Sequence, residues 1–238
     1  MFTFGILGGM GPMATVDLFG KIIQNTPAQI DQEHIRIIID NHPQIPSRID
    51  AIMAGGESPL PKLIESAKVL EKAGAVTIAM ACNTAHYWFE EVQQSVGIPM
   101  IHLIDNAAVQ IKQCQTEKSG NIMLLATSAT VKAKLYQPIF SKRGIDLKVP
   151  NAADQKIIAA AIDDIKSGHI SDNHYLKDML TMMEGYSHEG ITAFIGGCTE
   201  LPLLFPHLHG NFEKYDPTLL LAKEVVRQAA CYSEIAAK

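Results

Sequence analysis

Two cysteines occupy equivalent places in two similar stretches of the sequence. Cys82 follows an apolar run within residues 76–86 (VTIAMACNTAH), and Cys198 follows another within residues 191–201 (ITAFIGGCTEL). An apolar run that ends in small polar residues is typical of a buried parallel strand breaking into a turn and then a helix. Because open α/β sheets bind ligands at the carboxyl ends of their strands, both thiols are candidates for a functional site.

A thiol in the first turn of a helix is suited to acid/base chemistry. The unpaired backbone N–H groups and the positive end of the helix dipole lower its pKa and favour the thiolate. The same N–H groups bind anions such as carboxylates. Two similar halves packed face to face would place the thiols on opposite sides of one carbon, where one removes a proton and the other returns it. The alternative for each cysteine is a buried structural thiol, which is a common state of free cysteine.

Strands alternate with helices along the whole chain, which predicts a parallel α/β architecture. Apolar runs predict strands at residues 2–8, 35–40, 76–80, 98–103, 120–126, 146–149 and 191–196. Helical periodicity predicts helices at residues 14–25, 59–73, 104–115, 151–166, 175–185 and 217–237, with further helix up to residues 96 and 143.

The pattern restarts after the fourth strand. Cys82 and Cys198 are separated by nearly the same interval as Ile6 and Leu124, two residues of similar strand–turn stretches. This offset indicates two pseudo-symmetric domains, each a small parallel sheet flanked by helices. We expect the first domain to comprise residues 1–103 with 212–238, whose last helix packs back, and the second to comprise residues 104–211.

Composition and net charge limit the kinds of molecule that the protein is expected to bind. The chain has 25 acidic and 20 basic residues and a net charge of −5, which argues against nucleic-acid binding. No apolar run approaches the roughly 20 residues that cross a bilayer, and the start MFTFGILGG lacks the basic region of a signal peptide. Cysteines without CxxC pairing favour free thiols in the cytoplasm. Cys114 and Cys231, both in stretches typical of helix, are interpreted as small buried hydrophobic residues. A small molecule is the expected partner, with no membrane contact.

Six segments together carry a resemblance to a known family. They are GILGGMGPMAT (5–15), NHPQIPSR (41–48), ACNTAH (81–86), LLAT (124–127), DDIKSG (163–168) and GGCTEL (196–201). In this order, over nearly the whole chain, they resemble the aspartate/glutamate racemase family, most closely its aspartate racemase branch. The resemblance implies a cofactor-independent amino-acid racemase, with its active site between two similar α/β domains. It also implies a homodimer.

The resemblance assigns roles to individual residues. Cys82 and Cys198 match the two catalytic thiols, and Met10 matches a residue that lines the pocket. The positions that hold the α-carboxylate and α-amino group are Asn83, Thr84, Thr127 and Thr199. Arg48 and Lys166 match the basic residues that recognise a side-chain carboxylate. A guanidinium on a strand-end loop suits bidentate carboxylate binding, whereas Lys166 by itself is typical of a solvated helix end.

Two departures from the glutamate racemase pattern favour aspartate as the substrate. Met10 and Glu200 stand where glutamate racemases carry an aspartate and a histidine. Glu200, beside the second thiol, is a candidate for tuning or relaying its proton, although a carboxylate at a helix start also serves as a dipole partner. The alternatives are a racemase of glutamate, of another amino acid or of a hydantoin, or a non-catalytic protein of the same fold that binds an anionic metabolite.

Cofactor and metal motifs are weak. The turn at residues 8–11 lacks the full G-x-G-x-x-G of a dinucleotide site. Cys82 and His86 stand four residues apart and His207 and His209 share a loop, but no third ligand has a recognisable spacing. His86 is interpreted as a surface or pocket-wall residue. We therefore expect no metal and no cofactor.

Overall fold

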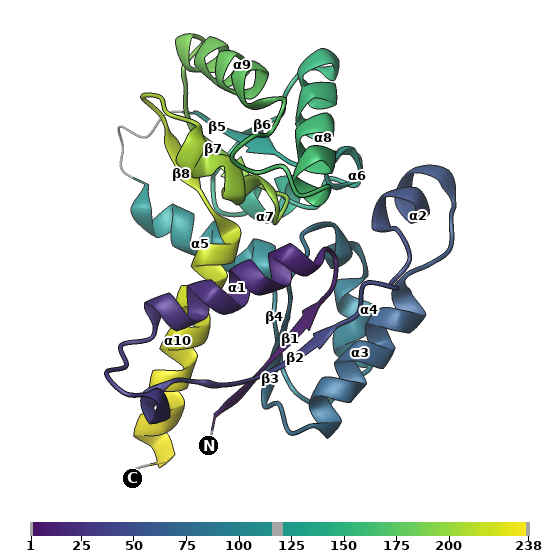
Figure 1. The fold of residues 1–238 in the computed structure, drawn as a ribbon, viewed down its shortest axis with the longest axis vertical. Helices are drawn as coiled ribbons and strands as arrows, with labels where there is room; N and C mark the ends of the chain where they lie inside the picture. Colours follow the sequence, from purple (N-terminus) through teal and green to yellow (C-terminus); the bar gives the residue numbers. More distant parts are fainter. Residues whose placement is uncertain (1, 116–120, 237–238) are drawn as a thin grey trace. The chain divides into compact units, whose positions relative to one another are not determined.

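The computed structural model describes residues 2–115 and 121–236 and divides the chain into two compact units. One unit contains the residues up to Asn106 together with those from Thr218 onward, and the other spans Ala107–Pro217 (Figure 1). The predicted strand start at Gly120 and the predicted helix end at Ala237 lie outside the described residues.

The first unit is built on a parallel sheet with the strand order β2-β1-β3-β4. Leu7 of β1 stands opposite Met80 of β3, so these two strands end side by side. The strands are β1 (Thr3–Gly8), β2 (Arg36–Asn41), β3 (Thr77–Met80) and β4 (Met100–Ile101).

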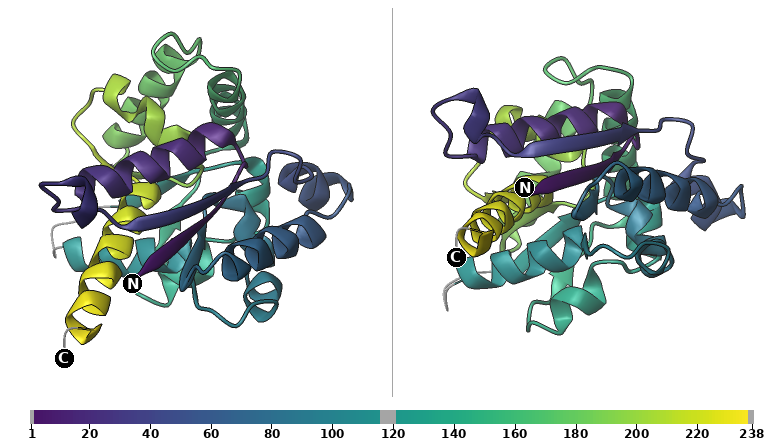
Figure 2. Two further views of the ribbon diagram at one scale, coloured as in Figure 1. Left: turned by 60° about the horizontal axis from the view of Figure 1, so that its bottom comes forward. Right: turned by 90° about the horizontal axis from the view of Figure 1, so that it is seen from below.

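Helices cover both faces of this sheet, because side chains alternate along each strand. Leu7 and Ile78 pack with Leu63 and Leu70 of α3 on one face. Figures 1 and 2 show α3 and α4 on one side of the sheet and α1 and α10 on the other. The helical elements here are α1 (Pro12–Asn25), η1 (Asp31–Glu33), α2 (Arg48–Ala54), α3 (Leu60–Lys72), η2 (Thr84–Trp88), α4 (Phe89–Gln94), the start of α5 (Leu103–Cys114) and most of α10 (Pro217–Ala236).

The second unit repeats this plan with the strand order β6-β5-β7-β8, also parallel. Met123 and Phe194 of the sheet pack against Ile162 of α8 and Met183 of α9. The predicted α/β class with two similar sheets is therefore confirmed. The elements are β5 (Asn121–Leu125), α6 (Ser128–Lys132), α7 (Gln137–Ser141), β6 (Leu147–Lys148), α8 (Ala152–Lys166), α9 (Leu176–His188), β7 (Ile191–Gly196), η3 (Leu201–His207) and β8 (Glu213–Tyr215).

Several local predictions differ from the structure. The helix expected up to Arg143 is broken into α6 and α7, and Lys134 between them has a positive φ of 52°. The segment after Cys82 begins as the 3₁₀ helix η2. Residues 212–217 were expected with the first domain but belong to the second unit, because β8 pairs with β7. The strand β8 has only three residues, which is too short for its pattern to be recognised as a strand in the sequence.

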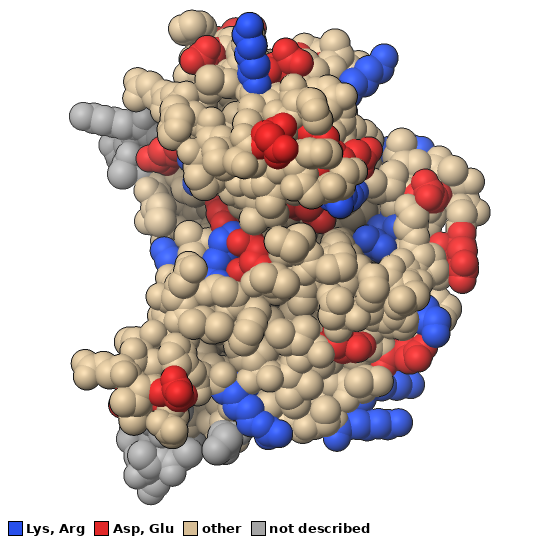
Figure 3. Space-filling model, viewed as in Figure 1, with Lys and Arg blue, Asp and Glu red and all other residues tan. Residues whose placement is uncertain are grey.

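The surface carries charges of both signs. Basic and acidic side chains are interspersed on the face shown in Figure 3. Among the described residues, no helix is long and apolar enough to cross a membrane.

Candidate functional site

In the first unit, two turns meet at the carboxyl ends of adjacent strands. The Gly-rich turn after β1 carries Met10, and the turn after β3 carries Cys82; both side chains belong to one buried cluster. Gly9 has a φ of +90°, and a Cβ there would lie 2.4 Å from the carbonyl carbon of His42. Only glycine allows this backbone approach. The strand pairing therefore places Met10 beside the Cys82 turn, as the edge of an α/β sheet requires.

A buried histidine, His86, fixes the backbone of Cys82 by a hydrogen bond to its carbonyl oxygen. The Nδ1 atom of His86 lies 2.8 Å from the Cys82 carbonyl oxygen, and its Nε2 atom accepts the Leu103 N–H at 3.1 Å. Burial, aided by the nearby His102, lowers the pKa of His86 to about 3. The imidazole is therefore neutral at physiological pH and donates from Nδ1. The expectation of a helix-surface histidine was wrong, since His86 is buried and both ring nitrogens are used inside the unit.

Asn83 and Thr84 follow Cys82 and are buried with it. Asn83 stands at the N-cap position of η2, and Thr84 is the first residue of this 3₁₀ helix. The three consecutive polar side chains thus share one turn at the end of β3.

Arg48 lies beside the Met10 turn, but not on the strand-end loop that the sequence indicated. It is the first residue of α2, whose N-cap Ser47 accepts the Asp50 N–H. Its guanidinium donates to the carbonyl oxygens of Ile45 (3.1 Å) and Pro46 (3.0 Å) and, more weakly, of Met10 (3.4 Å). A guanidinium has five N–H donors, so these three bonds orient it and leave donors for a carboxylate.

The second unit forms the equivalent edge from β5 and β7. The Gly197 N–H donates to the Leu125 carbonyl oxygen at 2.7 Å, which places the turn after β7 beside the end of β5. A Cβ on Gly197 would lie 2.5 Å from Leu124 Cδ1 and 3.0 Å from Ala126 Cβ, so glycine gives this close approach its room. Thr127 follows β5 and caps α6 by accepting the Thr130 N–H at 3.2 Å. Cys198, after β7, therefore corresponds to Cys82, after β3. Thr127, after β5, corresponds to the turn after β1.

Cys198 is held as a thiol by a buried carboxylate. Its Sγ atom donates to Glu200 Oε2 at 2.9 Å, and Thr199 Oγ1 donates to the same oxygen at 3.1 Å. Burial and the Glu200 charge raise the pKa of the Cys198 thiol well above its usual range. The expected lowering of its pKa was therefore wrong: η3 begins only at Leu201, and the nearest charge is negative.

Lys166 ends α8 and is partly exposed. Its Nζ atom lies 3.4 Å from Asp163 Oδ1, in a pair too exposed to contribute much stability. The Lys166 charge nevertheless opposes the pKa increase at Cys198. The structure therefore supports a solvated helix end that also acts electrostatically on the thiol.

Tyr136 is a buried residue near Cys198 that the sequence did not reveal. Its ring stacks on Phe140 with the centroids 5.6 Å apart. Burial is the main cause that raises the pKa of its phenol, and the neighbouring Cys198 and Asp216 add to this increase. No local motif marks Tyr136, because its relation to Cys198 arises only when α6, α7 and β7 come together.

Within each unit, then, the structure groups the residues that the sequence selected. The first unit brings together Met10, Arg48, Cys82, Asn83 and Thr84, and the second brings together Thr127, Lys166, Cys198, Thr199 and Glu200.

The carboxylate beside Cys198 leads to a first prediction. Replacing Glu200 by glutamine removes a negative charge that raises the thiol pKa, so the Cys198 pKa will fall and the thiolate will form at lower pH. We expect the pH profile of Cys198 alkylation, followed by peptide mass spectrometry, to shift toward acid. Glu213→Gln, on the exposed strand β8, serves as the control. An unchanged profile in Glu200→Gln would show that Glu200 does not set the state of the thiol.

Comparison with known proteins finds one family that matches most of the chain. The sequence model of the Asp/Glu/hydantoin racemase family matches residues 7–225. The broad-specificity amino-acid racemase RacX of Bacillus subtilis is 28% identical over 237 residues, covering 96% of this chain and 98% of the relative. A glutamate racemase of Persephonella marina is 31% identical over 157 residues, covering 61% and 57% of the two chains. The solved structure of the Picrophilus torridus aspartate racemase has a TM-score of 0.86 and 32% identity, covering 97% of this chain and 95% of that one.

Proposed function

Because this chain belongs to the Asp/Glu/hydantoin racemase family, we propose that it interconverts the L and D forms of an acidic amino acid, aspartate in the first place, without pyridoxal phosphate. One observation carries the proposal. Each unit places a buried cysteine just beyond the end of the equivalent strand, β3 or β7, of a sheet with the same strand order. Two such thiols match a reaction that needs an acid and a base on opposite faces of one carbon.

The proposed proton transfers assign different resting states to the two sulfurs. A Cys82 thiolate removes the α-proton, the carbon–hydrogen bond electrons delocalise into the α-carboxylate, and the Cys198 thiol returns its proton to the opposite face. Cys198 suits the donor role because it is held protonated against Glu200. The reverse direction starts from the state that the forward transfer leaves: the Cys198 thiolate removes the α-proton, and the Cys82 thiol, which carries the proton taken in the forward step, returns it to the opposite face. Fixed donors around the substrate carboxylate stabilise the charge that develops.

The family resemblance of individual positions supports a set of substrate-binding roles. We propose that Asn83 and Thr84 of one unit and Thr127 and Thr199 of the other hold the α-carboxylate and α-amino group. Arg48 and Lys166 would then recognise the side-chain carboxylate, with Met10 against the substrate. The guanidinium of Arg48 supports this role, because the Met10 turn fixes its direction and leaves donors available.

A broader amino-acid specificity is the second candidate. The relative of Bacillus subtilis is described as a broad-specificity racemase, and Lys166 in this chain is partly engaged by Asp163. Glutamate as the substrate is the closest variant within the first candidate, and a non-catalytic protein that binds an anionic metabolite is the remaining alternative.

Solvent exchange separates these candidates. The purified protein, without added pyridoxal phosphate, is incubated in D₂O with L-aspartate, D-aspartate, the two glutamates or L-alanine. NMR follows the α-proton signal, and chiral chromatography follows the enantiomers. We expect the aspartate α-proton to exchange and the enantiomers to converge. Faster exchange of alanine would select broad specificity, and aspartate binding without exchange of any amino acid would reject racemisation.

We also propose that the chain forms a homodimer through the exposed side of α1. Four apolar side chains of this helix lie 36–59% exposed, at Met13, Val16, Phe19 and Ile23. Such a stripe is unusual on a free surface. Val16→Asp should lower the mass measured by light scattering, and an unchanged dimer would place the contact elsewhere.

A further inference from the structure

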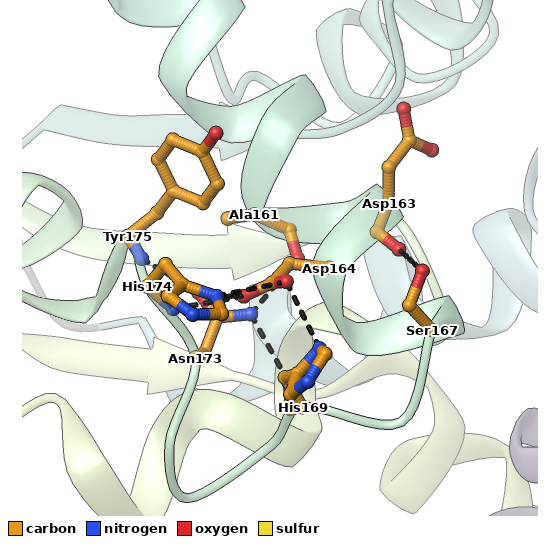
Figure 4. Close-up of polar contacts among 8 residues, drawn as sticks. All are labelled: Ala161, Asp163, Asp164, Ser167, His169, Asn173, His174 and Tyr175. Atoms are coloured by element: carbon orange, nitrogen blue, oxygen red, sulfur yellow. Dashed lines mark hydrogen bonds and ion pairs between the residues drawn. The ribbon is translucent and has the colours of Figure 1, made fainter.

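The loop between α8 and α9 is held rigidly in the second unit. Gly168, with a φ of +101°, ends α8, and the His169 N–H donates to the Asp164 carbonyl oxygen at 3.1 Å. The buried amide of Asn173 donates to the carbonyl oxygens of Ala161 (3.1 Å) and His169 (3.2 Å). These bonds fix the loop from inside, as Figure 4 shows.

The fixed loop directs two imidazoles at one carboxylate. His174 Nδ1 lies 3.0 Å from Asp164 Oδ2, and His169 Nδ1 lies 3.1 Å from Asp164 Oδ1 (Figure 4). The ligand atoms of the three residues all lie within 4.8 Å of one another. The His174 backbone N–H, which donates to Asp164 at 2.8 Å, is the main cause that lowers the pKa of this carboxyl, followed by the histidine side chains. Asp164 is therefore a carboxylate at neutral pH.

His169 is incompletely satisfied in this arrangement. Its Nδ1 atom is shielded from solvent, yet it makes no hydrogen bond of acceptable geometry within the described residues. Its only polar neighbour recorded there is the Asp164 oxygen at 3.1 Å, which is close enough for an ion pair but poorly aligned. A buried polar atom of this kind normally has a partner, so a bound ion is a physical explanation for its orientation.

From this geometry we propose that Asp164, His169 and His174 bind a divalent transition-metal ion such as Zn²⁺ or Ni²⁺ through one carboxylate oxygen and two Nδ1 atoms. Ligands bonded at about 2.0–2.2 Å around a tetrahedral ion stand about 3.3 Å apart, close to the 3.1 Å that separates Asp164 Oδ1 from the Nδ1 atom of each histidine. Two imidazoles with a carboxylate suit such ions better than Mg²⁺ or Ca²⁺, which prefer oxygen ligands.

The proposed site is open rather than closed. The His174 side chain is 68% exposed, so water can complete the coordination. The sequence predicted no metal site because the ligands come from the last turn of α8 and the loop after it, at spacings of five residues that match no helix face.

Metal titration of the untagged protein tests the proposal. Isothermal titration with Ni²⁺ should show one site per chain, and His169→Gln and His174→Gln should each weaken binding by at least about tenfold, since each removes a directly bonded ligand. His188→Gln, an exposed histidine at the end of the neighbouring helix α9, is the matched control and should bind as the wild type does.

The cysteines are a competing class of ligand, so a spectrum must accompany the titration. Bound Co²⁺ should show visible d–d bands without the intense near-ultraviolet bands of thiolate coordination. Circular dichroism of the two variants should match the wild type, because His174 is exposed and His169 partly so. Absence of Ni²⁺ binding, binding that both variants retain, or a thiolate spectrum would each overturn the proposal.

Discussion

Cys82→Ala and Cys198→Ala will each lower the rate of racemisation by about 10²–10⁴-fold, the contribution that a positioned acid or base makes to a proton transfer. Each thiol serves one face of the α-carbon in the proposed mechanism, so neither can replace the other. Initial rates from both enantiomers of aspartate, measured by chiral chromatography, give the size of the effect. Cys114→Ala is the control, because this exposed thiol ends α5 and has no proposed role.

Two further observations keep this prediction open to contradiction. Removing either buried sulfur leaves a small cavity, which can lower stability. The thermal unfolding temperature of each variant shows whether a loss of activity results from a loss of folded protein. A Cys82→Ala/Cys198→Ala double variant that turns over aspartate normally would remove the two-thiol mechanism. A single variant that keeps the wild-type rate would assign the chemistry to the other cysteine and a different partner.

Arg48→Gln is expected to reduce kcat/KM for aspartate by about 10²–10³-fold, because an unpaired substrate carboxylate in a partly desolvated site costs about 2–5 kcal/mol. The same change should affect racemisation of alanine, which lacks the second carboxylate, by much less. Comparing kcat/KM for the two substrates separates charge recognition from general damage. Arg36→Gln, on the edge strand β2, is the matched control and should leave both substrates unchanged.

The backbone contacts of Arg48 require a second variant. Its guanidinium also orients the Ile45, Pro46 and Met10 carbonyl oxygens, so Arg48→Gln disturbs the turn as well as the charge. Arg48→Lys keeps the charge without the planar fork and should retain part of the preference for aspartate over alanine. An equal loss for both substrates in both variants would make Arg48 a structural residue of the Met10 turn.

Most of the architecture could be predicted from local sequence. The apolar runs ending in Gly8, Met80, Leu125 and Gly196 mark the central strands, because buried parallel strands need continuous hydrophobic residues. The turns after two of these strands could also be predicted, because glycines follow the apolar runs directly, as Gly9 and Gly197 do. Weak elements such as β8 and α2 were missed, because short segments take their structure from their neighbours.

Some features of the candidate site could likewise be predicted from the sequence, whereas others depend on the fold. The sequence by itself determined which residues stand at the strand ends, Cys82 and Cys198 above all, because the end of each apolar run and the turn after it follow from local pattern. Only the tertiary structure decided their surroundings: the neutral His86 beneath Cys82, the thiol of Cys198 held against Glu200, and the grouping of Asp164 with two histidines. Charge states and ligand clusters depend on burial and on distances between side chains, and the chain sets these only when it folds.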